Sequence, residues 1–222
     1  MPAHSGTRRT GPRSDVDVRT LVLDTAERLF AEHGHGAVSI RQLARDADVA
    51  PTAVAYHFDD RDGVLRAVLV RRGQEAMLRV HARLADVVGA PGTPTANDLV
   101  RALLDPYLEL LARSPVGGLR WLKLMYVLAT SDHPVWRQAV SSDAELPGLY
   151  RGAFARVLPD VPADAVPRLA NLTVYSMLGV LARADQPGFG SPWTPGAGVD
   201  EEFVDLVVRF GSAGLLGALE AT

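Results

Sequence analysis

Apolar residues recur along the first third of the chain at the three- and four-residue spacing that is typical of amphipathic helices. The first stripe consists of Val18, Leu21, Val22, Ala26, Leu29 and Phe30. It predicts a helix that ends at Gly34, because glycine accepts the left-handed backbone of a helix cap.

The pattern then predicts a short second helix over about residues 40–46. Ser39 with Gln42 three residues later has the spacing of a capping box. The apolar face of this helix consists of Ile40, Leu43, Ala44 and Ala47. Asp48 follows where the chain must turn sharply, and aspartate tolerates left-handed geometry better than most residues other than glycine.

A third short helix is predicted to begin at Pro51, since proline is favourable in the first turn. Val54 and Phe58 lie one turn apart and are expected to face inward. The opposite face then consists of Thr52, Ala53, Tyr56 and His57. Three helices with a tight turn before the third have the geometry of a helix-turn-helix, whose last helix enters the DNA major groove.

The pattern of apolar positions also predicts helices in the remainder of the chain. Asp60 is a candidate N-cap for a long fourth helix that the segment GAPGTPT at 89–95 ends. Further helices are predicted near 97–113, 116–130, 134–157, 163–184 and 200–219. Strictly alternating runs of β-branched residues are missing, so we expect an all-α protein without strands.

Composition narrows the function classes. The 222 residues are 47% apolar and carry a net charge of −3, so a protein coated in basic charge is excluded and any DNA contact must be local. The absence of cysteine excludes disulfides, thiolate metal sites and thiol nucleophiles. Residues 1–17 are polar and include Arg8, Arg9 and Arg13 without an apolar stretch after them, so we interpret them as a disordered basic arm.

The sequence contains no apolar run that is long enough to span a membrane, so we expect a cytoplasmic protein.

Residues 22–69 closely resemble the DNA-binding domain of the TetR family of bacterial transcriptional regulators. The resemblance rests on the A-x-x-L-F-A-x-x-G run that ends at Gly34, the S-I-R-Q-L-A run from Ser39, and Y-H-F at 56–58. It implies a helix-turn-helix domain over 18–62 and a helical domain over 63–222 that binds a small effector and dimerises.

The resemblance also assigns DNA-binding roles to residues at matching positions: Ser39, Arg41, Thr52, Ala53, Tyr56, His57 and Arg61. Thr52 and Ala53 would lie near bases, and the others would contact phosphates, with Arg41 reaching the backbone or a base edge. Four positions depart from the family pattern, namely Asp48, Ala50, Ala53 and Ala55. Residues 1–66 hold nine arginines against ten carboxylates, so phosphate attraction is expected to be weak unless the basic arm enters the minor groove.

For the effector site we single out residues with aromatic or soft side chains: Tyr107, Trp121, Met125, Tyr126, Phe154 and Tyr175. They could line a pocket for an apolar or amphipathic ligand, or they could fill the core. Residues 116–130 are apolar nearly all round, which indicates a central buried helix. The resemblance places a homodimer interface on the last two helices, where Gly211, Gly214, Gly217 and Ala218 would allow close approach.

The sequence therefore predicts a ligand-responsive regulator, by family default a repressor, that binds a near-palindromic double-stranded operator as a homodimer. The alternative is a helical small-molecule sensor or carrier with weak DNA binding. We do not expect an enzyme, a cofactor or a metal site. Ser131, Asp132 and His133 are adjacent in sequence, and neighbouring side chains generally point apart rather than converging as a catalytic triad does.

Overall fold

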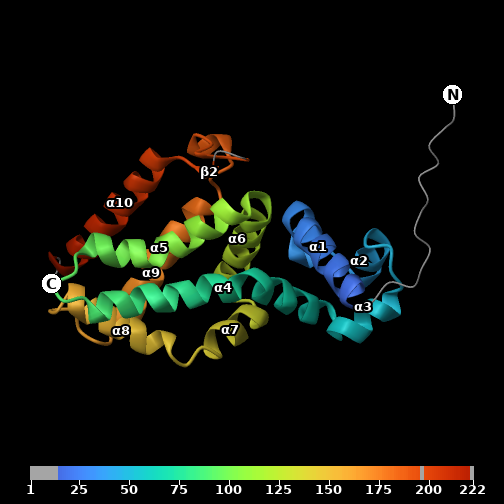
Figure 1. The fold of residues 1–222 in the computed structure, drawn as a ribbon, viewed down its shortest axis with the longest axis horizontal. Helices are drawn as coiled ribbons and strands as arrows, with labels where there is room; N and C mark the ends of the chain where they lie inside the picture. The colour runs from blue at the N-terminus through green and yellow to red at the C-terminus, as the bar shows by residue number, and fades with distance from the viewer. Residues whose placement is uncertain (1–14, 196–197, 221–222) are drawn as a thin grey trace.

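The computed structural model describes residues 15–195 and 198–220, and in these ranges the chain is almost entirely helical (Figure 1). The helices of the first unit are α1 (Asp15–His33), η1 (His35–Ala37), α2 (Ile40–Asp46) and α3 (Pro51–Phe58). Those of the second are α4 (Arg61–Gly89), α5 (Ala96–Arg113), α6 (Pro115–Thr130), α7 (Pro134–Ser141), α8 (Leu146–Val157), α9 (Val166–Leu181), η2 (Pro187–Phe189) and α10 (Glu201–Glu220). The all-α expectation is confirmed.

The small unit of α1, α2 and α3 lies at one end of the molecule, and α4 runs from it along the whole larger unit (Figure 1). Four residues of the apolar stripe of the first predicted helix, Val22, Ala26, Leu29 and Phe30, are buried, whereas Val18 and Leu21 are half-buried, and α1 packs against α2, α3, α4 and α6. Helix α1 begins at Asp15, so the last three residues of the predicted arm form its first turn. The rest of the arm lies outside the described residues.

The single helix predicted over 134–157 is wrong, because the chain forms two helices there, α7 and α8. Between them, the Asp143 carboxylate accepts a hydrogen bond from the Leu146 backbone N–H at 3.1 Å and so satisfies a donor at the start of α8. Pro147 follows in the first turn, where its missing N–H costs nothing.

A short antiparallel pair was also not expected. Strands β1 (Trp193–Thr194) and β2 (Gly198–Val199) pair Trp193 with Val199 and Thr194 with Gly198. Two residues a strand are too few to produce an alternating pattern that the sequence could show.

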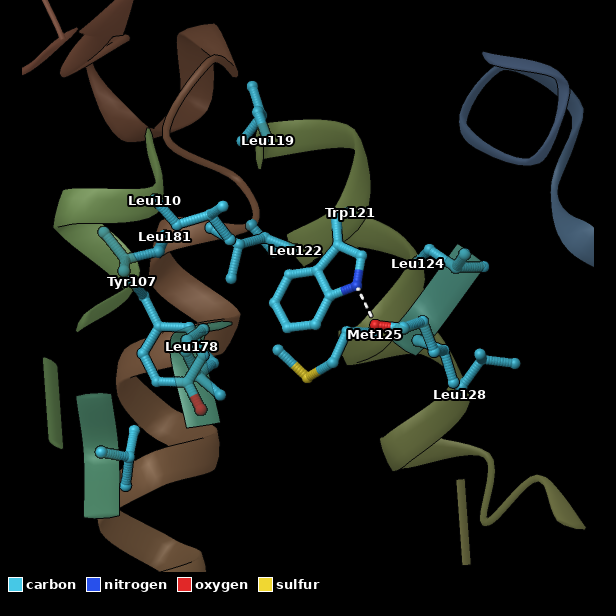
Figure 2. Packing of buried hydrophobic residues seen from close by; sticks show 14 of the residues in the cluster. Tyr107, Leu110, Leu119, Trp121, Leu122, Leu124, Met125, Leu128, Leu178 and Leu181 are labelled. Atoms are coloured by element: carbon cyan, nitrogen blue, oxygen red, sulfur yellow. Dashed lines mark hydrogen bonds between the residues drawn. The ribbon is translucent and has the colours of Figure 1, made fainter. Parts of the chain in front are cut away.

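The core of the larger unit is centred on α6, and Trp121 joins this helix to α4 (Figure 2). Its indole Nε1 donates a hydrogen bond to the Leu69 carbonyl at 3.0 Å. A Cβ atom at Gly73 would lie 2.8 Å from the indole ring, so only glycine fits beneath it. The expectation of a central buried helix holds for one side of α6, whereas Val116 and Val127 on the rest of the helix remain exposed.

Candidate nucleic-acid interface and effector region

The turn between α2 and α3 has the geometry that the sequence predicts. The Ser39 hydroxyl accepts a hydrogen bond from the Gln42 backbone N–H at 3.2 Å and caps α2. Asp48 adopts a positive φ of 53°, as expected for the residue of the sharp turn. The Val49 N–H then donates to the Ala44 carbonyl at 3.0 Å, which ties the turn back onto α2.

Helix α3 is buried on one side and open on the other. Val54 and Phe58 lie in the core, as predicted. On the open side Tyr56 is 78% exposed, and its ring lies 5.2 Å from that of His57. Thr52 is also exposed, whereas Ala53 and His57 are half-buried. This side of α3 can therefore approach a large ligand such as a DNA duplex without any rearrangement of the core.

The junction between α3 and α4 fixes how α3 is presented. Asp60 caps α4 by accepting a hydrogen bond from the Gly63 N–H at 2.7 Å, which confirms the predicted N-cap. A Cβ at Gly63 would lie only 1.8 Å from the Phe58 carbonyl oxygen, so the last turn of α3 packs directly on the backbone of α4. Asp59 makes the corner with a φ of 63°.

The arginines around α3 differ in what they contact. Arg61 donates from Nη1 to the Gly36 carbonyl at 3.2 Å and lies 3.8 Å from Asp62, so part of its hydrogen-bonding capacity is already used. Arg41 is exposed on α2. The sequence analysis missed Arg19, whose guanidinium lies 5.4 Å from the centre of the Phe58 ring. No spacing rule connects it with α3, because the contact joins residues from different helices.

The candidate effector residues separate into two groups. Tyr107, Trp121, Met125 and Phe154 are all buried in the larger unit, where the rings of Tyr107 and Trp121 stack with centroids 6.4 Å apart (Figure 2). Tyr175 is half-buried and its hydroxyl accepts a hydrogen bond from Trp136 Nε1 at 3.3 Å.

Tyr126 stands apart from this group. Its ring occupies the space beside Gly179, where a Cβ would lie 2.8 Å from it, and the Arg183 guanidinium lies 5.2 Å from its centre. It lines a hollow of about 370 Å³ between α1 and the end of α9.

Three tyrosines bring polar groups into the apolar interior. Burial raises the pKa of Tyr107 to about 12, and proximity to Tyr175 adds to the shift. Burial also raises the pKa of Tyr150 above its ordinary value, with further contributions from Tyr107, Tyr175 and Asp143.

Helices α9 and α10 leave a large apolar surface uncovered. A groove of about 540 Å³ runs between them. Phe210 is 73% exposed and Leu172 is 66% exposed in it, and Leu206 and Phe189 are exposed as well. We refer to this surface as the α9–α10 face. A single chain rarely exposes so many large apolar side chains together unless something covers them.

Within the described part of the chain, no group of three or more histidines and carboxylates is placed to hold a metal ion. None of the described helices has both the length and the hydropathy to cross a membrane.

Together α2, its turn and the exposed side of α3 define a helix-turn-helix DNA-binding protein. The family described as "Bacterial regulatory proteins, tetR family" matches residues 22–68, and "Tetracyclin repressor-like, C-terminal domain" matches residues 101–214. The chain belongs to the TetR family of transcriptional regulators, which is not a family of enzymes.

Two similar curated proteins are repressors by name. The chain is 34% identical over 114 residues to the HTH-type transcriptional repressor Rv3405c of Mycobacterium tuberculosis, across 51% of this chain but only 57% of that protein. It is 27% identical over 177 residues to the HTH-type transcriptional repressor AcnR of Corynebacterium diphtheriae, across 75% of this chain and 78% of that protein.

Solved structures share the fold. Mycobacterium smegmatis AmtR superposes with a TM-score of 0.58 at 21% identity, across 95% of this chain and 89% of that one. The multidrug binding protein EbrR, solved in complex with imidazole, has a TM-score of 0.52 at 23% identity, across 91% of this chain and 96% of that one.

Proposed function

We propose that the protein is a ligand-responsive repressor that binds a near-palindromic operator as a homodimer and releases it when a small apolar or amphipathic effector binds. The observation that carries this proposal is the two-sided character of α3, with Val54 and Phe58 buried and Tyr56 78% exposed. An exposed tyrosine at the end of a rigidly packed short helix is well suited to contact a duplex.

In the proposed complex, α3 lies in the major groove. Thr52 and Ala53 are close to bases, while Tyr56 and His57 contact phosphates. Ser39 and Arg41 on the α2 side, and Arg61 at the start of α4, hold the sugar-phosphate backbone. The short side chains of Ala50, Ala53 and Ala55 leave few base-reading groups, so shape and backbone contacts would contribute much of the affinity.

The α9–α10 face supports a homodimer as its occupant. Gly214 and Gly217 have open space where a side chain would be, so a second helix can approach the backbone of α10 closely. With two-fold symmetry the two α3 helices would lie about 34 Å apart, one turn of DNA.

The tyrosine-rich interior supports an effector site in the larger unit. EbrR, which shares the fold, is a multidrug binding protein that was solved in complex with imidazole. An effector that favours one spacing of the α3 helices needs a coupling free energy of only about 1 to 3 kcal/mol to change DNA affinity some 5- to 150-fold. A regulator of this kind acts on the chromosome, so we place it in the cytoplasm.

The test is fluorescence anisotropy with a labelled palindromic fragment from upstream of its own gene and a scrambled fragment as the control. Specific binding should weaken steeply with salt and should exceed binding to the scrambled fragment by at least about 1,000-fold. Equal affinity for both fragments would contradict the assignment as a repressor and would favour the small-molecule carrier. The negative charge of three aspartates around Arg61, at 59, 60 and 62, also favours the carrier.

A further inference from the structure

The face of α4 that turns toward α7 and α8 lines a hollow of about 480 Å³. Gln74, Met77, Leu78 and His81 form this wall at successive helical turns, and the opposite wall consists of Ala139, Ser142, Asp143, Ala144 and Glu145. The volume is in the range of pockets that hold small organic ligands, about 300 to 1,000 Å³. We call it the α4–α7 hollow.

Met77 connects the hollow with Tyr107 of the interior. Met77 lines the hollow, and its sulfur lies 3.9 Å from the Tyr107 hydroxyl, which donates to it. Asp143 is in the opposite wall and contributes to the raised pKa of Tyr150. An apolar group in the hollow can therefore contact a thioether that itself contacts Tyr107.

The walls combine apolar surface with negative charge. Leu78 is 64% exposed and presents apolar surface to the hollow. Asp143 and Glu145 are the two carboxylates of the hollow, and His81 is the single basic side chain among its lining residues. His81 Nε2 lies 2.8 Å from Asp143, and its Nδ1 lies 3.7 Å from Glu145.

An aromatic side chain next to the lining of the hollow also favours positive charge. Hydroxyl oxygens and the faces of tyrosine and tryptophan rings present partial negative charge to a cation. The Tyr107 hydroxyl, 3.9 Å from the sulfur of Met77 in the lining of the hollow, is such a group. An anionic ligand would instead meet two carboxylates with one histidine to balance them.

We propose that the effector is a lipophilic cation that binds in the α4–α7 hollow, with its apolar body on Leu78 and Met77 and its positive charge beside Asp143 and Glu145. This inference rests on the proposed function and names the chemical class of its ligand. The site is coupled to DNA reading because one wall is α4, the helix that begins at the α3 junction. A ligand that separates His81 from Asp143 changes how α4 is held against the α7–α8 turn.

Tetraphenylphosphonium and tetraphenylborate test the proposal, because the two ions have nearly the same size and shape and opposite charge. Calorimetric titration in sodium buffer should show saturable binding of tetraphenylphosphonium and at least about tenfold weaker binding of tetraphenylborate. Equal affinity for the two ions would overturn the proposal.

Two substitutions locate the site. Asp143→Asn keeps an oxygen that can cap α8 and removes the charge, so it should weaken tetraphenylphosphonium binding about tenfold. Glu145→Gln is at an exposed position where folding is not at risk, and it should weaken binding about threefold. Asp164→Asn, at an exposed carboxylate outside the hollow, is the matched control and should bind as the unmodified protein does. Unchanged binding in both Asp143→Asn and Glu145→Gln would overturn the assignment.

Operator binding measured on the same samples separates this inference from the proposed function. DNA binding without a preference for the cation would overturn the ligand class alone. A charge preference that depends on Asp143 in a protein without operator binding would leave the cation site standing and would refute the repressor.

Discussion

The Arg72 guanidinium of α4 donates three hydrogen bonds to the Glu27 carboxylate of α1. Its Nε lies 3.0 Å from both carboxylate oxygens, and its Nη2 lies 2.9 Å from Oε2. The carboxylate is 5% exposed, and the Arg72 Nη1 also donates to the Ser114 hydroxyl at 3.0 Å. One guanidinium thus joins the DNA-reading unit to α4 and to the residue before α6, so these three elements are expected to move together.

Removal of Glu27 should be costly for this reason. Glu27→Ala leaves Arg72 without its carboxylate in a largely buried place, and we expect a loss of about 3 kcal/mol in the free energy of unfolding. Urea denaturation at fixed protein concentration measures it. The double substitution Glu27→Leu with Arg72→Met should recover at least half of the loss, since no buried charge is then unpaired. A loss of the same size in the double variant would mean that packing, not charge, is responsible.

Tyr56→Ala should separate DNA binding from folding. Because Tyr56 is 78% exposed, its truncation should change the free energy of unfolding by less than about 0.5 kcal/mol. Affinity for the operator should fall at least about tenfold if the ring contacts the backbone of DNA. Tyr56→Phe is the companion variant and shows whether the hydroxyl or the ring is responsible. Unchanged operator affinity in Tyr56→Ala would remove this side of α3 from the interface.

Much of this architecture could be predicted because local rules govern it. The cap at Ser39, the positive φ at Asp48, Pro51 at the start of α3 and the N-cap at Asp60 all follow from short-range chemistry. The break between α7 and α8 was missed, because the apolar spacing continues across it and only the Asp143 bond to the Leu146 N–H and Pro147 mark the start of a new helix.

The candidate effector site was less predictable, since it depends on contacts between distant segments. Tyr126 was grouped with Tyr107 by residue type, yet it packs on Gly179 near α1. His81 and Asp143 are 62 positions apart, and no spacing rule could have brought them to 2.8 Å. Residue type alone predicted a tyrosine-rich interior. The fold was needed to show that His81, Asp143 and Glu145 lie together nearby.

Arg61 provides a test through the salt dependence of binding. In the free protein it donates to the Gly36 carbonyl, and on DNA we expect it to contact one phosphate as well. Arg61→Ala should then reduce the slope of log affinity against log salt concentration by about 0.9. Arg168→Ala, at an exposed position on α9, is the control and should leave the slope unchanged. An unaltered slope in Arg61→Ala would show that Arg61 serves only to hold Gly36.

Phe210→Glu tests the dimer. The side chain is 73% exposed on α10, so the substitution should not disturb the fold of the single chain. A carboxylate at the centre of an apolar interface should weaken self-association by at least about 30-fold, measured by sedimentation velocity. Operator affinity should fall with it, because only a dimer engages both half-sites. Val140→Glu, at an exposed apolar position on α7, should leave both properties intact, and a Phe210→Glu protein that remains dimeric would place the interface elsewhere.

Alkaline pH tests the environment of Tyr107. The folded protein keeps this hydroxyl protonated up to a pKa of about 12, whereas an unfolded chain releases the proton near pH 10. Between these values the folded state holds more protons than the unfolded state, so its stability is intact below about pH 10 and falls as the pH rises through 12. The share of Tyr107 is about 2 kcal/mol, and the raised pKa of Tyr150 adds a loss of the same sign.

Tyr107→Phe should therefore reduce the loss of stability over this range by about 2 kcal/mol while it keeps the ring stacked on Trp121. Urea midpoints from pH 9 to 12 measure the difference, with Tyr56→Phe at an exposed site as the control. If both proteins lose stability along the same curve as the unmodified chain, water reaches the Tyr107 hydroxyl and the tyrosines form an open, hydrated cavity. A flatter curve for Tyr107→Phe alone would show that the interior around Tyr107 is closed to water.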